Sequence, residues 1–461
     1  MTERRVSLDE LPTSRFHRRV ALVAAGGPFC DGYLLGIIVV ALPLIARDLH
    51  LSAAQAGLIG AASLLGMFVG GIVFGPMTDR FGRQSMYVLN LAVFVLCSIA
   101  HLFVTGATAL FALRLVMGIA LGADYPIATA LASEFLPRRL RGPVLSSLVL
   151  CLWVGYTLSL ATGLFVHTGD SSTWRYVLAS AAIPSAIFLV LRLNIPESPR
   201  WLVSVGRIDE ARRIVETHLG RQADFDHLLA HTSRSAPRTG LGLSSLRDLF
   251  ARGYGRMVFF CSVFWTCQIA PSFAIKTFQP LLLKSLGVTH VLSGTLVIIS
   301  FAIVGTALGM LVINRIGRRP LLIAAGTIAT LSLFALATPL SALAVFAIAL
   351  FIVFTIAEAA GSALQFVYPN EVFPTDVRAT GMGLAMSVSR IGAAAGTFVL
   401  PITIAKWGAA NGLLIAASIA ALGLLVSYRM APETCNLPLA DSEPTQAREK
   451  LSPVSNNEVR T

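Results

Sequence analysis

The sequence predicts an all-α membrane protein whose twelve transmembrane helices form two pseudo-symmetric halves of six. Of its 461 residues, 55% are hydrophobic and only 13% are charged, which is typical of chains that cross a bilayer many times. Two further observations support this fold class. Basic residues crowd alternate connections between the apolar spans, and three short motifs occur once in each half of the chain.

Each predicted span supplies about 20 apolar residues, the length that an α-helix needs to cross the hydrocarbon core of a bilayer. The first span is too long for a cleavable signal peptide and lacks a small-residue cleavage site. The spans of the first half are 20–46, 53–77, 85–104, 108–132, 144–166 and 174–193. The spans of the second half are 256–283, 290–313, 320–338, 341–368, 379–405 and 408–429.

Polar segments separate and flank the two halves, which we place at 20–193 and 256–430. Residues 1–19 are predicted to form an N-terminal arm, 194–255 a central loop with short helices, and 431–461 a polar tail. The positive-inside rule places all three segments in the cytoplasm. The spans are expected to lie in the plasma (inner) membrane. The basic residues that carry this signal are Arg4, Arg5, Arg15, Arg18, Arg19, Arg80, Arg83, Arg138, Arg139, Arg141, Arg315, Arg318 and Arg319.

Three motifs of the first half return in the second half at offsets of 235 to 237 residues. In membrane proteins built from such parallel repeats, the binding site lies near the membrane midplane, between the two halves. The repeated stretches are 79–83 (DRFGR) and 314–318 (NRIGR), 134–137 (EFLP) and 371–374 (EVFP), and 196–198 (PES) and 432–434 (PET).

These motifs also carry a family resemblance. Residues 75–83 (GPMTDRFGR) resemble the signature loop of the major facilitator superfamily, and 196–202 (PESPRWL), 369–374 (PNEVFP) and Arg114 resemble its sugar-porter branch. The resemblance covers nearly the whole chain and implies the major facilitator fold and transport by alternating access. It also implies gating or structural contacts at the ends of the helices, made by Asp79, Arg80, Arg83, Glu134, Arg141, Glu197, Arg200, Arg315, Arg318, Glu371 and Arg378.

Stretches inside the spans resemble other branches of the superfamily. Residues 31–33 (DGY) are similar to aromatic-acid and organic-acid proton symporters, although Leu34 stands where those carriers have a second aspartate. Residues 124–126 (DYP) are similar to phosphate–proton symporters, and 389–392 (SRIG) to carriers of organic acids and organic ions.

Charged side chains inside the first half are the candidate proton-coupling groups. Arg114 and Asp124 lie in span 4, and Asp31 lies in span 1. Because a charge inside an apolar helix is costly, such residues usually mark a transport pathway or a binding site. A carboxyl group removed from water can load and release a proton. The alternative is a structural pair of Arg114 with one of the two aspartates.

Aromatic residues of the first half are candidate substrate contacts. Trp153 and Tyr156 are three residues apart in span 5 and share a helix face, and Tyr125 follows the aspartate of span 4. Such rings can stack on a cyclic substrate, and packing in the helix core is the alternative.

Span 7 carries a polar stripe at helical spacing. Gln268, Ser272, Lys276 and Gln279 follow one another at intervals of four, four and three residues, so one face of the helix should hold them all. A lysine within a span should face a cavity or an acidic partner. The alternative is that Lys276 reaches along the helix to the outer surface.

Spans 10 and 11 add further polar residues to the second half. Glu358, Ser362 and Gln365 share a face of span 10, where Glu358 is a fourth proton-coupling candidate. Arg390 lies in span 11 among small and apolar residues that supply no local carboxylate. Arg390 should therefore face water, an acid across a cavity or an anionic ligand.

The charges together favour a proton-coupled symporter of a small organic anion, an aromatic or heterocyclic carboxylate. The planar guanidinium of Arg390 suits two-point binding of a carboxylate. The expected partners are this small molecule, protons and the lipid bilayer, and the protein is expected to be a monomer. The candidate cavity holds three acids and three bases, Asp31, Asp124, Glu358, Arg114, Lys276 and Arg390.

A sugar or polyol proton symporter is the first alternative, because the sugar-porter loops are retained. The Gln-Gln…Asn set that holds sugar hydroxyls in span 7 of that branch is reduced here to Gln268, and Phe366 replaces the span 10 tryptophan. The remaining amides are Gln279 and Gln365. A phosphate–proton symporter, motivated by Asp124, and a non-transporting membrane sensor are further alternatives.

Several function classes are not expected. The sequence shows no nucleophile triad, no phosphate-binding loop and no metal-ligand spacing, so neither an enzyme nor a bound cofactor or metal is predicted. The net charge of +12 lies mainly in the connections on one side of the membrane, so it reports topology and does not indicate nucleic-acid binding.

Overall fold

The computed structural model describes residues 10–166, 170–220, 224–226, 228–229, 249–251, 253–339, 343–373 and 377–435. The predicted arm, central loop and tail are thus described only in part. The side chains of Asp79, Tyr125 and Phe366 also lie outside the described part, although their backbones belong to helices.

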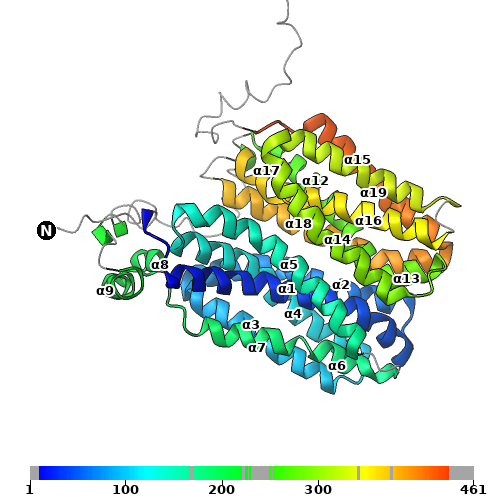
Figure 1. The fold of residues 1–461 in the computed structure, drawn as a ribbon, viewed down its shortest axis with the longest axis horizontal. Coiled ribbons are helices and arrows are strands. Elements are labelled where there is room, and N and C mark those ends of the chain that lie inside the picture. The colour runs from blue at the N-terminus through cyan, green and yellow to red at the C-terminus, as the bar shows by residue number, and fades with distance from the viewer. Residues whose placement is uncertain are drawn as a thin grey trace, which may run out of the picture.

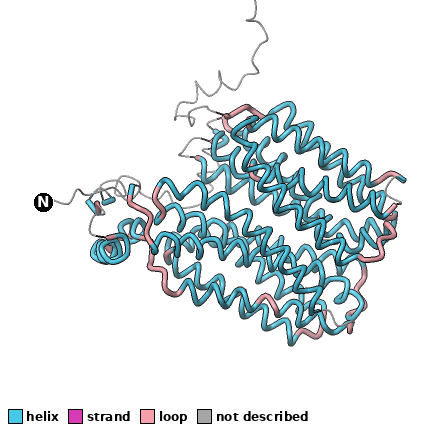
Figure 2. Tube along the Cα trace, viewed as in Figure 1, coloured by secondary structure: helices cyan, strands magenta, loops and turns pink. Residues whose placement is uncertain are grey.

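The predicted fold class is confirmed. The described chain contains twelve helices that are long and apolar enough to cross a membrane. They run roughly alongside one another in two groups, drawn in blue to green and in green to orange in Figure 1, and Figure 2 shows the same arrangement as helical tubes joined by short loops. The two groups are the two halves expected from the repeated motifs.

The first half consists of six spans. They are α1 (Arg15–Asp48), α2 (Ala53–Phe81), α3 (Arg83–Ala100), α4 (Ala107–Phe135), α5 (Arg138–Val166), and the sixth span formed by α6 (Trp174–Ala179) and α7 (Ala182–Arg192). Helix α1 begins inside the predicted arm. It does so because Ser14 caps it: the Ser14 hydroxyl accepts the His17 N–H, and the His17 ring bonds back to the Ser14 N–H.

The second half repeats this plan. Its helices are α12 (Gly255–Thr277), α13 (Gln279–Ser285), α14 (Val291–Ile316), α15 (Arg318–Leu336), α16 (Ala344–Ser362) with its continuation α17 (Leu364–Val372), α18 (Arg378–Trp407) and α19 (Ala409–Met430). The predicted seventh span, 256–283, is therefore divided. Helix α12 ends at Thr277, and α13 begins with Pro280 in its first turn, where a missing N–H is tolerated.

The same helix pairs pack together in both halves. Helix α1 packs on α5 as α12 packs on α18, α2 packs on α4 as α14 packs on α16, and α3 packs on α7 as α15 packs on α19. The halves meet through α2 with α18 and α5 with α14. The packing thus follows the internal repeat, and it leaves one long interface between the halves.

Glycines allow the closest of these contacts. A Cβ at Gly118 of α4 would overlap the Ser63 carbonyl oxygen of α2, and a Cβ at Gly66 of α2 would overlap the Leu115 carbonyl oxygen of α4. The backbones of α2 and α4 therefore approach as closely as membrane helices do at small residues.

Short helices cover the end of the first half. Helices α8 (Pro199–Ser204) and α9 (Ile208–Ile214) and the following turn η4 (Val215–Leu219) belong to the central loop. Trp201, Leu202 and Ala211 form a small apolar cluster there, and Leu11 of the N-terminal arm packs into it.

Candidate functional site

A central cavity lies between the two halves. Its volume, counted as the space that the centre of a water molecule can occupy, is about 110 Å³, and helices of both halves line it. It collects seven of the predicted proton-coupling and substrate-binding residues, which are Asp31, Trp153, Tyr156, Lys276, Glu358, Gln365 and Arg390. The other lining residues are Leu35, Met67, Leu121, Val149, Leu152, Ile269, Ser272, Phe273, Ser362 and Met386.

Lys276 of α12 is held at the wall of this cavity by three groups. Its Nζ lies 2.6 Å from Glu358 Oε2, 2.6 Å from Ser272 Oγ and 4.4 Å from the centre of the Trp153 ring. The sequence offered a cavity or an acidic partner for this lysine, and the structure provides both. Because Trp153 belongs to α5 and Lys276 to α12, the cation also joins the two halves.

Asp31 and Arg390 are the other two charged residues of the described cavity lining, and neither has its hydrogen-bonding capacity filled. Asp31 is 4% exposed and Arg390 is 8% exposed. Among the described residues, no donor reaches Asp31 Oδ1 and no acceptor reaches Arg390 Nε. Arg390 has the Phe273 ring beside it, with 5.9 Å between Cζ and the ring centre. Asp31 Oδ1 and Arg390 Nε are themselves sealed from the cavity, but both residues line it, so a ligand or water can bind the atoms of the two groups that open onto it.

Arg114 and Asp124 do not line this cavity, and they do not pair with each other. Arg114 donates to the Leu34 carbonyl of α1 at 3.3 Å. Asp124 Oδ1 instead accepts from Arg192 Nη1 at 3.3 Å and from Asn90 Nδ2 at 3.1 Å. All of these side chains are at most 1% exposed. The arginine–aspartate pairs considered from the sequence are thus replaced by a buried Asp124–Arg192 pair.

Arg192 is the charged residue that sequence reasoning missed. It is the last residue of α7, at the end of a predicted span, where an arginine usually marks the membrane boundary. One feature of the sequence could have pointed to a partner such as Arg192. Asp124 lies inside the apolar span 4, and a carboxylate there needs a cation from another span.

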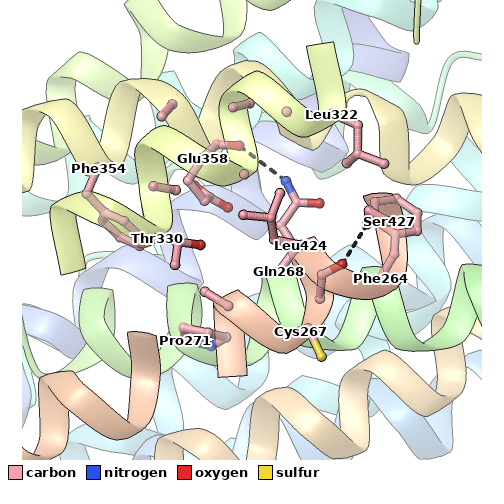
Figure 3. A pocket seen from close by; sticks show the side chains of 17 residues that line it. Phe264, Cys267, Gln268, Pro271, Leu322, Thr330, Phe354, Glu358, Leu424 and Ser427 are labelled. Carbon is pink, nitrogen blue, oxygen red and sulfur yellow. Dashed lines mark hydrogen bonds between the residues drawn. The ribbon is translucent and has the colours of Figure 1, made fainter. Parts of the chain in front are cut away.

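The predicted polar stripe of span 7 is also divided. Ser272 and Lys276 face the central cavity, whereas Gln268 faces a second cavity between α12, α15, α16 and α19 (Figure 3). Gln279 is buried in α13, beyond the end of α12, and does not line either cavity. The helix break after Thr277 separates it from the stripe.

The repeated motifs form two matching charge clusters at the helix ends. In the first half, Arg83 Nε lies 3.2 Å from Glu134 Oε1, and Glu197 accepts the N–H groups of Arg83 and Gln84 at 3.0 and 3.2 Å. Glu197 therefore caps the start of α3. Gly82, with φ of 95°, precedes this helix, and a side chain there would collide with the Glu197 carboxylate.

The second half repeats this cluster. Arg318 Nη2 lies 3.0 Å from Glu371 Oε1, and Glu433 accepts the N–H groups of Arg318 and Arg319 at 3.0 and 3.1 Å. Gly317, with φ of 92°, occupies the position in the second half that Gly82 occupies in the first. Glu433, which the sequence showed only as part of a repeat, thus caps the start of α15.

Other predicted residues of these clusters have different surroundings. Arg141 donates to the Leu136 carbonyl at 3.2 Å, and Arg378 donates to the Phe373 carbonyl at 3.0 Å, so both bind the end of the preceding helix. Arg200 is half-buried. The remaining two, Arg80 and Arg315, are exposed.

Known proteins similar to this chain are membrane transporters. The profile of the family described as "Sugar (and other) transporter" matches residues 20–445. The putative metabolite transport protein YaaU of Escherichia coli is 38% identical over 95% of this chain and 96% of its own. The niacin transporter NiaP of Acinetobacter baylyi is 27% identical over 85% of this chain and 88% of its own.

Solved structures share the fold. The partially occluded, inward-open xylose transporter XylE of E. coli superposes with a TM-score of 0.78, covering 92% of this chain and all of its own. The two sequences are 21% identical, so the likeness is one of architecture.

Proposed function

Because this chain belongs to the sugar (and other) transporter family, we propose that it carries a small organic anion together with a proton across the plasma membrane. The substrate would bind in the central cavity, and the two halves would rock about it between outward-open and inward-open states. The positive-inside rule supports a cytoplasmic location for both ends of the chain.

The observation that carries this proposal is the unfilled bonding capacity of Arg390 and Asp31 at one cavity. A buried guanidinium without an acceptor is costly, and a bound carboxylate would supply the acceptors in the planar geometry that arginine favours. The carboxyl group of Asp31 provides a place for the coupled proton.

The charges of the cavity support one proton for each monovalent anion. The described lining contains two acids, Asp31 and Glu358, and two bases, Lys276 and Arg390, so it is neutral when all four are ionised. A proton on Asp31 leaves one positive charge in excess, which a monovalent anion neutralises. Proton and anion therefore favour each other's binding, and this reciprocal coupling is what a symporter needs.

The aromatic lining supports a cyclic substrate. Trp153, Tyr156 and Phe273 face the cavity, and such rings stack on planar ligands. The niacin transporter among the similar proteins is consistent with this class, because niacin is a pyridine carboxylate. We therefore place an aromatic or heterocyclic carboxylate first.

A sugar or polyol is the second candidate substrate. It is supported by the family and by the xylose transporter that shares the fold. Gln365, Ser272 and Ser362 of the central cavity could bind hydroxyl groups. Of the three amides that favoured this alternative, however, Gln268 and Gln279 lie outside the central lining, which leaves one amide beside four charged side chains.

Uptake into proteoliposomes would decide between the two. The purified protein would be given labelled nicotinate, benzoate, xylose and myo-inositol, each with and without an inward proton gradient. Accumulation of a carboxylate that requires the gradient supports the proposal. Gradient-driven accumulation of xylose or myo-inositol, with none of either acid, would replace it with the sugar alternative.

A further inference from the structure

One face of the C-terminal half changes from charged to neutral along the wall of the central cavity. Glu358, Ser362 and Gln365 follow one another at intervals of four and three residues along α16 and α17, and all three line this cavity. Because an α-helix rises about 1.5 Å per residue, Gln365 lies about 10 Å along the helix from Glu358. The Lys276–Glu358 ion pair is therefore at one end of this face, and an uncharged amide is at the other.

The amide of Gln365 is open to the cavity and has no hydrogen-bonding partner in the described part of the chain. Gln365 is only 6% exposed, but neither its amide oxygen nor its amide nitrogen is sealed from the cavity that the residue lines. Gln268 of the same half differs: its oxygen is sealed, and its nitrogen donates to the Glu358 carbonyl at 3.5 Å. Gln365 is thus the amide that a ligand of the central cavity can reach.

The hydroxyl groups of the same lining are less available. Ser362 donates to the Ala359 carbonyl at 2.7 Å, and Ser272 accepts from Lys276 at 2.6 Å. The Tyr156 hydroxyl, which has no hydrogen bond within the described residues, belongs to α5 of the other half. Gln365 therefore offers a free donor and a free acceptor on the half that also carries the guanidinium of the site.

Gln365 lies about one helical turn from Arg390 along the depth of the cavity. Helices α17 and α18 belong to consecutive spans that run in opposite directions, and the chain turns between Val372 and Arg378. Gln365 is seven residues before the end of α17 and Met386 is eight residues after the start of α18, so the two lie at similar depth. Arg390 is four residues beyond Met386, about 6 Å farther from the turn. A ring bound to Arg390 through its carboxylate and directed toward the turn would bring its far edge to Gln365.

An unsubstituted ring in this position would leave the amide unpaired. Water can bind the accessible atoms of Gln365 in the empty cavity, and a substrate that fills the cavity displaces that water. Benzoate presents only C–H groups at the far edge of its ring, so the lost hydrogen bonds are not replaced. Sites that hydrogen-bond a group of their substrate reject analogues without that group for this reason.

We propose that Gln365 binds a second polar group of the substrate, so that the site takes a ring carboxylate with a hydrogen-bonding nitrogen or hydroxyl group and disfavours benzoate. The amide N–H groups donate to a ring nitrogen, and either end of the amide can pair with a hydroxyl. Arg390 binds the carboxylate and Gln365 binds the opposite edge of the ring, both from the C-terminal half. This inference rests on the proposed function and narrows its substrate class.

A series of acids that share one shape tests the class. Isothermal titration calorimetry of the full-length protein in nanodiscs would compare benzoate with picolinate, nicotinate, isonicotinate, 3-hydroxybenzoate and 4-hydroxybenzoate. These acids differ in the polar group of the ring and keep the carboxylate. We expect at least one of the substituted acids to bind about tenfold more tightly than benzoate. Equal affinities for all of them would overturn the inference.

Variants test the residue. Gln365→Met removes both polar atoms and keeps an unbranched side chain, so the preferred acid should bind about tenfold more weakly while benzoate binds as before. Gln268→Met makes the same change in the second cavity and should keep the preference. A preference that survives Gln365→Met, or that Gln268→Met also abolishes, would overturn the assignment. If Tyr156→Phe removes the preference and Gln365→Met does not, the polar group binds Tyr156 instead.

The outcomes separate this inference from the proposed function. If every acid binds with the affinity of benzoate and enters with a proton gradient, the role of Gln365 is wrong and the symport of an organic anion stands. If no acid binds and xylose or myo-inositol does, the proposed substrate class and the narrower class named here fail together. Should Gln365→Met fail to fold, the ligand series with the wild-type protein still decides the substrate class.

Discussion

Lys276 and Glu358 are 82 residues apart in sequence and form an ion pair, with 2.6 Å between Nζ and Oε2. Both residues line the central cavity, and Glu358 also lines the second cavity. Each group is at most 7% exposed. Each therefore depends on the other for its charge to be tolerated.

The first prediction is that removing either partner destabilises the protein strongly. An uncompensated buried charge costs about 3–5 kcal/mol, whereas replacing both partners by apolar residues of similar size costs far less. Lys276→Met and Glu358→Met should each lower the midpoint of thermal unfolding, and the double variant should recover most of the loss. A double variant whose loss equals the sum of the two single losses would show that the residues are independent.

The second prediction concerns Arg390. Arg390→Lys keeps the charge but loses the planar fork, so carboxylate binding should weaken by about 1–3 kcal/mol. The measurement is the affinity for a substrate acid and for its neutral amide in wild type, Arg390→Lys and Arg390→Ala. Equal weakening of acid and amide would assign Arg390 a structural role and favour the sugar or polyol alternative.

The third prediction separates the two aspartates of the first half. Asp31 faces the cavity without a partner at Oδ1, so Asp31→Asn should abolish gradient-driven accumulation and leave counterflow exchange measurable. Asp124 is held by Arg192 and Asn90, so Asp124→Asn leaves a buried arginine without its counter-charge and should chiefly lower thermal stability. An Asp31→Asn variant that accumulates substrate like the parent would move the coupling to Glu358.

The fourth prediction is a contrast in pH dependence between two capping glutamates. Burial alone would raise the pKa of Glu433, but the N–H groups of Cys435, Arg318 and Arg319 outweigh it and lower the pKa below the usual 4.5. At Glu197 burial is the larger effect, and it raises the pKa despite the N–H groups of Ser198, Gln84 and Arg83. The two caps should therefore respond to pH in opposite directions.

The signs follow from proton linkage. A lowered pKa in the folded state means that Glu433 stabilises the protein above its unfolded pKa, and this contribution is lost as the pH falls through the folded value. The contribution of Glu197 is present below its unfolded pKa and is lost as the pH rises through the folded value. Glu433→Gln should thus cost stability at pH 7 and progressively less as the pH falls below 4.5, and at pH 7 Glu197→Gln should cost less. The same loss for both variants at pH 7 would contradict the contrast.

The sequence was sufficient for the fold and for part of the site. Long apolar stretches and duplicated motifs define the spans and halves, because the bilayer restricts backbone structure so strongly. Asp31, Lys276, Glu358 and Arg390 were identifiable for the same reason, since a charge within a span is costly wherever it lies. The structure places these four residues at one cavity, whereas Arg114 and Asp124, which were expected there too, lie elsewhere. The roles of all six in transport stay predictions.

The sequence could not show which charged side chains pair with one another. Asp124 pairs with Arg192, 68 residues away, and an arginine at the end of a span carries no mark that separates a membrane boundary from a buried partner. Similarly, helical spacing placed Gln268 on the face of Lys276, but α12 is surrounded by other helices and borders a cavity on two sides. The spacing of residues in the sequence shows which of them share a face of a helix. Which cavity or side chain that face contacts depends on how the neighbouring helices pack around it.

The capping glutamates also bear on how the chain is made. Glu197 and Glu433 each follow the sixth span of their half, yet each binds the start of that half's third span. A half can therefore gain this closing contact only after its last span has left the ribosome. The first half can be complete while the second is still being synthesised, so the two are suited to sequential insertion and assembly in the order of translation.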